Sequence, residues 1–321
     1  MSNASRPAPA PWLTVIMPTH SGERWVDAAL RSIADEAADG VEVLVLDSSP
    51  NSATLDIARS FSDRLHLRIF ERCDPFMWHA KTNNGVEIAE SSHVCWLHQD
   101  DLWLPGRTAA VRKWIEAAPE APLHLAPSNI IDWAGRKLGI WRCPLPAQDE
   151  VASALLTERL LVQNFVAAPA PVFRKAAWLA CGGLDEQLWY TADWDIWLKL
   201  AASGPVFYHD ELTTAFRIHN DSLTMTGSRS VADFTSQMKI VLDRHLVKVR
   251  GYSKSVGRAA RASIAVNAAL ASAAAGDLTG LPQALFEVAR LGPAGLLRYV
   301  RDSRIVERSV PRMRARLRGA F

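Results

Sequence analysis

The stretch of sequence that decides the fold reads Val94-Cys95-Trp96-Leu97-His98-Gln99-Asp100-Asp101-Leu102-Trp103-Leu104-Pro105. Its apolar start, residues 94–97, is typical of a short buried strand that ends where the polar residues 98–101 begin. Pro105 and the run 108–118 then indicate a helix. Ligands of open parallel sheets bind beyond the carboxyl ends of the strands, so we expect a ligand site at residues 98–101.

The side chains at this strand end, one imidazole and two carboxylates, allow two interpretations. As a hard, anionic cluster, His98, Asp100 and Asp101 suit a divalent cation that carries a phosphorylated ligand. In the other interpretation, Asp100 and Asp101 only cap the helix that follows. These residues alone do not decide between the two, so the flanking chain has to.

The composition restricts the class of protein. A chain of 321 residues, 49% hydrophobic and 22% charged, fits one large α/β domain with an appendage, or two domains. No apolar run approaches the roughly 20 residues that span a bilayer. We expect the Ala- and Pro-rich leader, residues 1–11, to be disordered. The four cysteines lack metal-type spacing, which favours reduced, buried thiols in a cytoplasmic protein.

Charge is unevenly distributed along the chain. Residues 244–321 carry 15 Lys and Arg against 4 Asp and Glu, whereas the first 243 residues carry 21 against 30. The net charge of +2 therefore conceals an acidic body with a basic tail, which indicates two different surfaces.

The first 118 residues alternate between strand-like and helix-like patterns. The expected strands are 13–19, 41–47, 65–70 and 94–97, and the expected helices are 23–38, 52–61, 81–90 and 108–118. Four alternations with short connections predict a mostly parallel, doubly wound α/β sheet with helices on both faces. The turn after the first strand, residues 18–22, lacks G-x-G-x-x-G, which argues against dinucleotide binding, and no P-loop motif is present.

The pattern changes after residue 118. We expect a hairpin at 129–140, a helix at 148–161, a strand at 164–173, a helix beginning near Asp193 and a late strand at 213–219. From residue 231 onward the pattern is helical, with breaks near 251, 276–280 and 292–293.

Several of these segments, in this order, resemble a known family. The matching pieces are Val15-Ile16-Met17-Pro18-Thr19, Leu46-Asp47-Ser48-Ser49, Asn83-Asn84-Gly85-Val86, Asp100-Asp101-Leu102-Trp103-Leu104-Pro105, Gly182-Gly183-Leu184-Asp185-Glu186, Asp193-Trp194-Asp195-Ile196-Trp197-Leu198 and Phe216-Arg217-Ile218-His219. Together they resemble a family-two glycosyltransferase of the A-type nucleotide-diphospho-sugar fold. The resemblance covers about residues 13–225. It implies a catalytic domain at 12–229, between the leader and a basic helical extension at 230–321.

The resemblance implies a set of donor-binding residues. It places Pro18, Thr19, His20 and Asp47 around the nucleoside, with Asp47 accepting hydrogen bonds from the base or the ribose. The alternative for Asp47 is a turn cap with Ser49. Lys81 and Asn83 fall in the segment that approaches the donor. The family usually has Arg just before this Asn, and Lys81 is the candidate to replace its charge.

The resemblance also implies a divalent cation, but this chain departs from the family motif. Where the family has Asp-x-Asp, the chain reads His98-Gln99-Asp100, so an imidazole replaces the first carboxylate. Asp100 matches the usual metal ligand, and His219 matches a late position that often reaches the metal or the diphosphate. Imidazole suits Mn²⁺ better than Mg²⁺, so Mn²⁺ is favoured. A weakened or metal-free site is the alternative.

Two further residues receive roles through the resemblance. Arg217 can pair with phosphate oxygens in a bidentate way, which would offset charge on the leaving diphosphate. Asp193 matches the family's general base, although Ala192 replaces the Glu that usually precedes it. The alternative for Asp193 is a helix N-cap. Asp195, two residues further on, is expected to be structural.

The basic tail predicts either a membrane contact or a packed helical cap. Its arginines alternate with apolar residues: Arg298, Arg301, Arg304, Arg308, Arg312, Arg314, Arg316 and Arg318. This pattern is typical of helices that lie on anionic membranes. A solvated cap on the acidic body explains it equally well, and no motif supports nucleic-acid binding.

The sequence thus predicts a cytoplasmic inverting glycosyltransferase, with the inner face of the cell membrane as one location. Its donor would be a nucleotide-diphosphate-sugar, with UDP favoured, and its acceptor a saccharide or a lipid-linked saccharide in cell-surface polysaccharide synthesis. His98 and Ala192 motivate the alternative, a catalytically degenerate homologue that binds nucleotide-sugar or glycan without turnover.

Overall fold

An eight-stranded sheet forms the centre of the molecule, in the order β3-β2-β1-β4-β10-β6-β11-β9. The computed structural model describes residues 10–71, 77–146, 150–220, 222, 230–247 and 254–317. The strands of this sheet are β1 (Leu13–Thr19), β2 (Val41–Asp47), β3 (His66–Glu71), β4 (His93–Trp96), β6 (Leu123–Leu125), β9 (Glu150–Val151), β10 (Val172–Arg174) and β11 (Val206–Tyr208). Nearly all of the predicted leader, and the predicted boundary at 229, fall outside the described residues.

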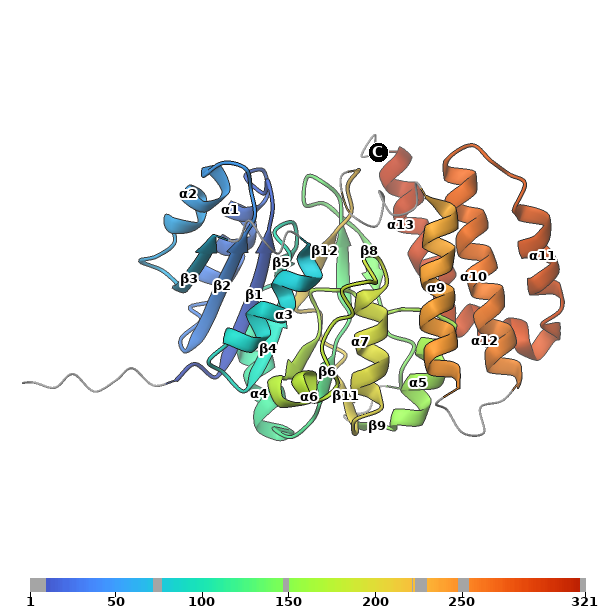
Figure 1. Ribbon diagram of the computed structural model, residues 1–321, viewed down its shortest axis with the longest axis horizontal. Helices are drawn as coiled ribbons and strands as arrows, with labels where there is room; N and C mark the ends of the chain where they lie inside the picture. Colours follow the sequence, from blue (N-terminus) through green and yellow to red (C-terminus); the bar gives the residue numbers. More distant parts are fainter. Residues whose placement is uncertain are drawn as a thin grey trace, which may run out of the picture.

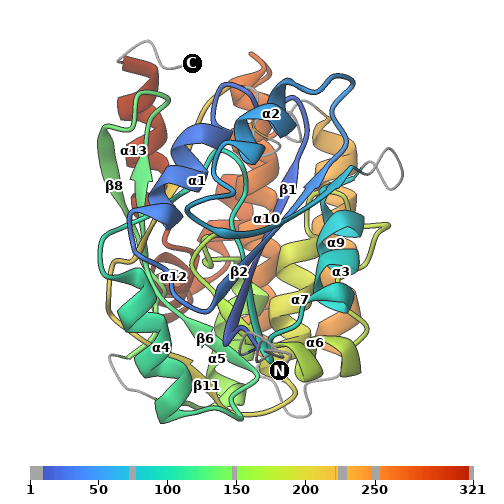
Figure 2. The same cartoon turned by 90° about the vertical axis from the view of Figure 1, so that its left-hand side faces the viewer.

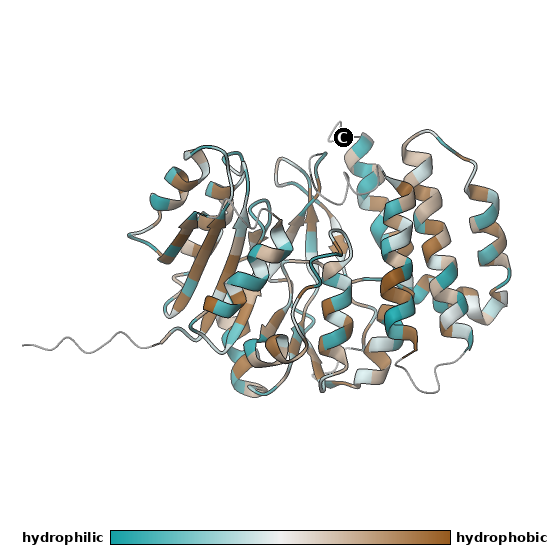
Figure 3. Ribbon diagram, viewed as in Figure 1, coloured by the Kyte–Doolittle hydropathy of each residue, from teal (hydrophilic) through white to brown (hydrophobic). Residues whose placement is uncertain are grey.

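The first four strands form the parallel half that the alternating pattern predicts. β1 pairs in parallel with both β2 and β4, and β2 with β3. Beyond β4 the sheet becomes mixed, because β10 runs antiparallel to both β4 and β6. Both faces are buried: Leu13, Val15 and Met17 belong to one core cluster, and Ile16 belongs to the other. This alternation follows from the two-residue period of a strand, and Figure 3 shows these strands as hydrophobic along their length.

Helices cover both faces of the sheet, which confirms the predicted fold class (Figure 1). On one face are α1 (Val26–Ala34), α2 (Ala53–Arg59) and α4 (Arg107–Ala117). On the other are α3 (Trp78–Ile88), α5 (Ser153–Val162), α6 (Lys175–Ala180) and α7 (Ala192–Ala201). The helix predicted at 148–161 thus begins only at Ser153, after β9.

A second, four-stranded sheet has the order β5-β12-β7-β8. Its strands are β5 (Leu102–Trp103), β7 (Ser128–Ile131), β8 (Lys137–Trp141) and β12 (Thr214–Arg217). β7 and β8 are the predicted hairpin, and its turn is held by Asp132, whose carboxylate accepts hydrogen bonds from the N–H groups of Ala134 and Arg136. Through β5, the residues directly after Asp101 pair with β12, so this sheet brings the late strand to the end of β4.

Two local predictions are wrong. The strand predicted at 164–173 is almost entirely irregular, and only β10 at its end pairs with the sheet. Pro169 and Pro171 lack the N–H that a ladder requires, which explains the difference. Asp100 and Asp101 also do not cap the next helix. α4 begins at Arg107, and its first turn is capped instead by Glu36, which accepts hydrogen bonds from the N–H groups of Gly106 and Thr108.

The C-terminal extension is helical and packs against the sheet domain (Figures 1 and 2). Its helices are α9 (Val231–Leu246), α10 (Lys254–Ala274), α11 (Leu281–Ala289), α12 (Gly292–Ser303) and α13 (Ile305–Leu317). Arg298 of α12 pairs with Glu158 of α5 at 3.4 Å, so the tail packs against the body as the helical-cap interpretation predicts. Within the described residues, no helix is both long and apolar enough to cross a bilayer.

Candidate active site

A cavity of about 400 Å³ opens at the carboxyl ends of β1 and β4. Its walls come from the strand ends, from the irregular segment 163–168, from the start of α7 and from the C-terminal helices. The predicted site residues that line it are Pro18, Thr19, His20, Lys81, His98, Asp100, Asp193, Arg217 and His219. Two predicted donor-binding residues, Asp47 and Asn83, are described by the structure but do not line the cavity.

Asp100 and His219 form a hydrogen-bonded pair in this cavity. His219 Nε2 lies 2.8 Å from Asp100 Oδ2, although the residues are 119 positions apart in sequence. Burial alone would raise the pKa of Asp100, but the hydrogen bond from His219 and the charge of His98 hold it below its ordinary value. The ring of His219 also packs on Trp25, with 5.2 Å between centroids. The pair therefore places an anionic oxygen and an imidazole at one point of the cavity wall.

His98 lines the same cavity, but its Nε2 makes no hydrogen bond to this pair. Its ring stacks on Trp96 and meets Trp78 edge-on, and burial lowers its pKa, which favours the neutral imidazole. His98 Nε2 and His219 Nδ1 are buried without a hydrogen-bond partner within the described residues. No group of three or more His, Cys, Asp and Glu side chains in those residues could hold a metal ion. The described part of the chain therefore does not assemble the predicted three-ligand metal site.

Asp101 and Arg217 connect the end of β4 to β12. Asp101 Oδ1 accepts the backbone N–H of Arg217 at 2.9 Å. Burial and the neighbouring charge of Asp100 raise the pKa of Asp101 well above its ordinary value. The Arg217 guanidinium donates to the carbonyl oxygens of Asp100, Asp132 and Trp133. Arg217 thus holds two turns in place at the cavity, and its predicted contact with phosphate stays a prediction.

The loop after β1 is held by a residue that the sequence did not indicate. Gln99 Oε1 accepts the backbone N–H of His20 at 2.9 Å, and Gln99 Nε2 donates to the His20 carbonyl at 3.1 Å. The ring of His20 lies 2.9 Å from the Ser48 carbonyl oxygen. These contacts fix the ends of β1, β2 and β4 relative to one another, so Pro18, Thr19 and His20 form one wall.

Lys81 lies beneath this wall as a buried cation. Only 2% of the residue is exposed, and its Nζ donates to the Thr19 carbonyl oxygen at 2.6 Å and to Ser48 Oγ at 2.9 Å. Burial lowers the pKa of Lys81 to about 8, although the charge of Asp47 opposes this shift. A buried positive charge therefore lines the cavity, and its replacement of the family's Arg stays a prediction.

Asp47 and Asn83 make contacts behind the cavity wall. The Asp47 carboxylate accepts hydrogen bonds from Thr19 Oγ1 and from the N–H and hydroxyl of Ser49, which are the contacts of the turn-cap alternative. Asn83 exchanges hydrogen bonds with the backbone of Leu184. A Cβ on Gly183, whose φ is +63°, would lie 2.6 Å from Asn83 Oδ1, so only glycine allows this approach. The structure does not bring either side chain to the cavity.

Asp193 lies in the first turn of α7, where it lines the cavity. The N-cap of this helix is Thr191, so the N-cap alternative for Asp193 is wrong. Its carboxylate accepts hydrogen bonds from Asn164 Nδ2 at 2.9 Å and from the Trp194 N–H at 2.7 Å. Burial raises the pKa of Asp193 to about 6, and the two hydrogen bonds oppose the shift. The group is mainly ionised at pH 7 and is able to accept a proton there.

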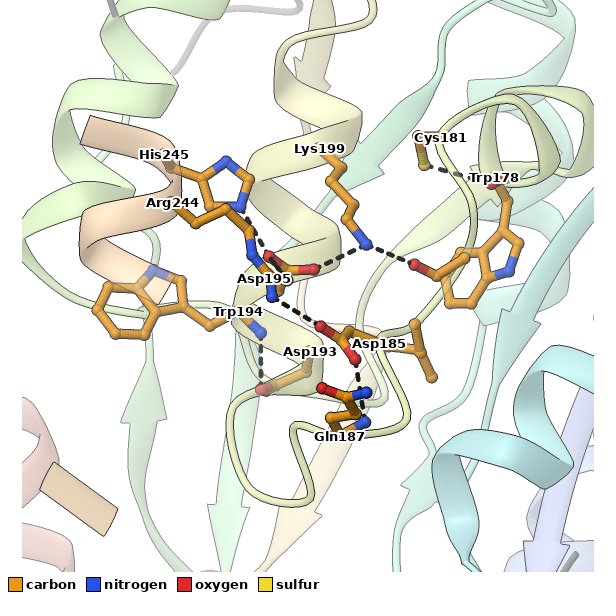
Figure 4. A network of polar contacts seen from close by, with 12 residues as sticks. Trp178, Cys181, Asp185, Gln187, Asp193, Trp194, Asp195, Lys199, Arg244 and His245 are labelled. Carbon is orange, nitrogen blue, oxygen red and sulfur yellow. Dashed lines mark hydrogen bonds and ion pairs between the residues drawn. The ribbon is translucent and has the colours of Figure 1, made fainter. Parts of the chain in front are cut away.

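Asp195 has the structural role that the sequence predicts. It is fully buried, and its carboxylate pairs with Lys199, Arg244 and His245 at 2.8 to 3.0 Å (Figure 4). Arg244 also pairs with Asp185 in the loop before α7. This network joins α9 to the start of α7, and it thereby fixes the turn that carries Asp193.

The C-terminal helices contribute cavity residues that the analysis of the sequence missed. These are Phe234 and Met238 of α9, Asn267 of α10, and Arg308 and Arg312 of α13. The i, i+4 spacing of Arg308 and Arg312 was visible and placed both on one helix face. What that face would meet was not visible, because Arg308 contacts Asn267, 41 residues earlier, and the strand ends that line the cavity lie still further away in sequence.

The fold and this cavity define an A-type glycosyltransferase. Residues 14–255 match the family described as "Glycosyltransferase like family 2", so the chain belongs to that family and is a transferase. An uncharacterized glycosyltransferase of Rickettsia prowazekii is 21% identical over 259 residues, which cover 75% of this chain and 76% of that protein. One of Haemophilus influenzae is 24% identical over 245 residues, covering 74% and 77%.

Solved structures show the same fold. The crystal structure of S. aureus TarS residues 1–349 in complex with UDP-GlcNAc has a TM-score of 0.62, with 16% identity, and the match covers 96% of this chain and 92% of that one. A mannosyltransferase of Pyrobaculum calidifontis in complex with GDP-Man and Mn²⁺ has a TM-score of 0.53, with 16% identity, over 94% and 86%.

Proposed function

We propose that this protein is an inverting glycosyltransferase that transfers a sugar from a nucleotide-diphosphate-sugar, with UDP favoured, to a saccharide or lipid-linked acceptor of cell-surface polysaccharide synthesis. The observation that carries the proposal is a single cavity lined by a buried cation, a carboxylate–imidazole pair and a separate carboxylate whose pKa is about 6. The TarS complex with UDP-GlcNAc, which matches nearly the whole chain, supports the choice of UDP.

The donor would bind at the strand ends. Pro18, Thr19 and His20 form the wall for the nucleoside, and the charge of Lys81 beneath them attracts the diphosphate. Arg217 keeps the turns at Asp100 and Asp132 in place, so that the wall is preorganised before the donor arrives. In this proposal Asp47 supports Thr19, and Asn83 supports the loop at Leu184, without touching the donor.

A divalent cation fits the residues at the end of β4. Asp100 supplies an anionic oxygen and His219 an imidazole nitrogen, and donor phosphate oxygens would complete the coordination. When bound, the ion would offset the negative charge that develops on the leaving diphosphate. The imidazole favours Mn²⁺ over Mg²⁺. His98, which stacks on Trp96, lines the same cavity as these two residues.

Asp193 would act as the general base in a single displacement. The acceptor hydroxyl oxygen forms a bond to the anomeric carbon, the bond from that carbon to the diphosphate oxygen breaks, and the hydroxyl proton passes to the Asp193 carboxylate. Attack opposite the leaving group inverts the anomeric configuration. Asn164 holds the carboxylate in position through its hydrogen bond of 2.9 Å.

Release of the nucleoside diphosphate tests the proposal. Wild-type protein with Mn²⁺ is expected to release UDP from a UDP-sugar. Asp193→Asn is expected to bind UDP but not to release UDP from the UDP-sugar. If wild type binds UDP but releases no nucleoside diphosphate from any UDP-, GDP- or dTDP-sugar, the degenerate binding homologue becomes the better description. Within the described residues, no three His, Cys, Asp or Glu side chains are placed so that they could hold a metal ion, and this observation favours the alternative.

We also propose contact with an anionic membrane on its cytoplasmic face, which would bring the enzyme to a lipid-linked acceptor. α11 and α12 expose Leu285, Phe286 and Leu297 at 69%, 55% and 74%, and Arg290 lies beside them. Exposed apolar residues beside a basic one suit such a surface. Co-sedimentation with phosphatidylglycerol vesicles is expected for wild type and not for the variant that combines Phe286→Asp and Leu297→Asp.

A further inference from the structure

Helix α13 is docked so that two of its arginines face the cavity. Pro311 packs on Gly139 of β8, where a Cβ on the glycine would lie 2.8 Å from Pro311 Cγ. Ala315 is fully buried against the second sheet, and Arg314 donates to the Leu138 carbonyl at 2.8 Å. Arg308 and Arg312 lie on the adjacent face of the helix and line the cavity. They are partly buried, so they differ from the exposed Arg316 on the same helix.

The charge of these two arginines is not balanced by the described residues. No ion pair within those residues includes Arg308 or Arg312. Arg308 Nη2 donates to Asn267 Oδ1 at 3.1 Å, whereas its Nε and Nη1 are buried with no partner in the described part of the chain. Burial and the like charge of Arg312 lower the pKa of Arg308 to about 10, so it is still a cation at pH 7. Buried, unpaired donors of this kind favour an anionic ligand.

The arginines lie beside the proposed base. Asn267, the partner of Arg308, donates to Gln163, and the next residue, Asn164, holds Asp193. Tyr190 lies near both arginines and near Asp193. Burial raises the pKa of Tyr190, the charge of Asp193 raises it further, and the charges of Arg312 and Arg308 oppose this shift. The charges that act on Asp100 and Lys81 come instead from His98, His219 and Asp47. The arginines thus belong to the Asp193 side of the cavity.

We propose that Arg308 and Arg312 bind an anionic group, a phosphate or a carboxylate, carried by the acceptor saccharide. This inference rests on the proposed function, because it assigns the Asp193 side of the cavity to the acceptor. The fork of a guanidinium matches both oxyanions, and two of them 4 residues apart on one helix can hold one group between them. The inference specifies the acceptor class as an acidic sugar or a sugar phosphate.

Calorimetric titration of the full chain, with the donor site saturated by UDP and Mn²⁺, tests the inference. The probes are glucose 6-phosphate, methyl glucuronoside and the neutral methyl glucoside. We expect at least one acidic probe to bind about tenfold more tightly than the neutral one. The preference between the first two probes distinguishes a phosphate-bearing from a carboxylate-bearing acceptor.

Three variants of these arginines and one control variant separate their role from that of the rest of the helix. Arg308→Gln and Arg312→Gln are each expected to lower the affinity for the acidic probe about tenfold. Arg308→Lys is expected to lower this affinity less. Arg316→Gln, which removes the same charge from an exposed position of α13, is the matched control and is expected to bind like wild type. A cooperative thermal unfolding transition at the wild-type midpoint shows that each variant is folded, so that UDP affinity is measured independently of folding.

Three results would overturn the inference. The first is that no acidic probe binds more tightly than the neutral one. The second is that Arg308→Gln and Arg312→Gln bind the acidic probe with the affinity of wild type. The third is that both variants lose UDP instead, which would assign the arginines to the donor diphosphate. If wild-type protein binds no nucleoside diphosphate at all, the proposed function fails, whatever the acidic probes do.

Discussion

The two walls of the cavity are built in different ways. The strand-end wall consists of loops that follow β1, β2 and β4, and hydrogen bonds such as those of Gln99 with His20 and of Lys81 with Thr19 tie these loops to one another. The helical wall is formed by α7, α9, α10 and α13, and Arg308 there keeps two buried cationic donors without partners in the described part of the chain. Loops tied to one another are preorganised for one ligand shape, whereas buried cationic donors without partners gain their hydrogen bonds only when a ligand arrives.

The largest effect is expected from Asp193→Asn. The amide cannot accept the acceptor's proton, so sugar transfer should fall by about a thousandfold. UDP affinity should stay within twofold of wild type, because the strand-end wall is untouched. Steady-state kinetics and calorimetry measure the two quantities. Full transfer activity in this variant would show that Asp193 is not the general base.

The network that fixes the helical wall can be broken at Asp195. Asp195→Ala leaves Lys199 and His245 without their buried partner, and we expect a loss of about 3 kcal/mol in the free energy of unfolding. Burial would raise the pKa of Asp195, but the hydrogen bonds from His245 and Lys199 hold it below its ordinary value. Its contribution is therefore present above about pH 4 and is lost as the pH falls further.

Urea unfolding of Asp195→Ala at pH 7 measures this loss. The matched control is Asp27→Ala, which breaks the exposed pair with Arg31 and should cost at most about 0.5 kcal/mol. Equal losses in the two variants would show that the buried network does not stabilise the helical wall.

The strand-end wall can be tested at Lys81. Lys81→Met removes the buried charge and its hydrogen bonds to Thr19 and Ser48, so UDP affinity should fall about tenfold. Lys175→Met is the control, since Lys175 also donates to two carbonyl oxygens, those of Glu87 and Ala89, but does not line the cavity. Calorimetry should show unchanged UDP affinity in that variant, and the expectation fails if both variants bind UDP equally.

The smallest effect concerns pH. The Asp193 carboxylate is the active form and its pKa is about 6, so kcat/KM for transfer should rise about tenfold between pH 5 and pH 7 and then level off. The hydrogen bond from Asn164 lowers this pKa, so Asn164→Ala should move the rise to higher pH. A rise centred near pH 4 in wild type would contradict the burial of Asp193.

The analysis of the sequence succeeded where contacts are local. The apolar runs of β1, β2 and β4 predicted the parallel half of the sheet, because the two-residue period of a buried strand is visible within seven residues. It failed at 164–173, because Pro169 and Pro171 interrupt the apolar run: only its end pairs with the sheet, and Asn164 and Ala168 line the cavity instead. Nine of the eleven site residues assigned by resemblance line the cavity, but Asp47 and Asn83 proved to support its wall from behind.

The sequence by itself determined the class of fold, the strand end at Asp100 and the spacing that puts Arg308 and Arg312 on one face of a helix. Only the tertiary structure decided that His219 pairs with Asp100 across 119 residues, that Asp195 ties α7 to α9, and that the arginines of α13 line the same cavity as Asp193. The physical reason is that backbone periodicity acts over a few residues, whereas a cavity wall depends on how separate elements pack, which no local pattern encodes.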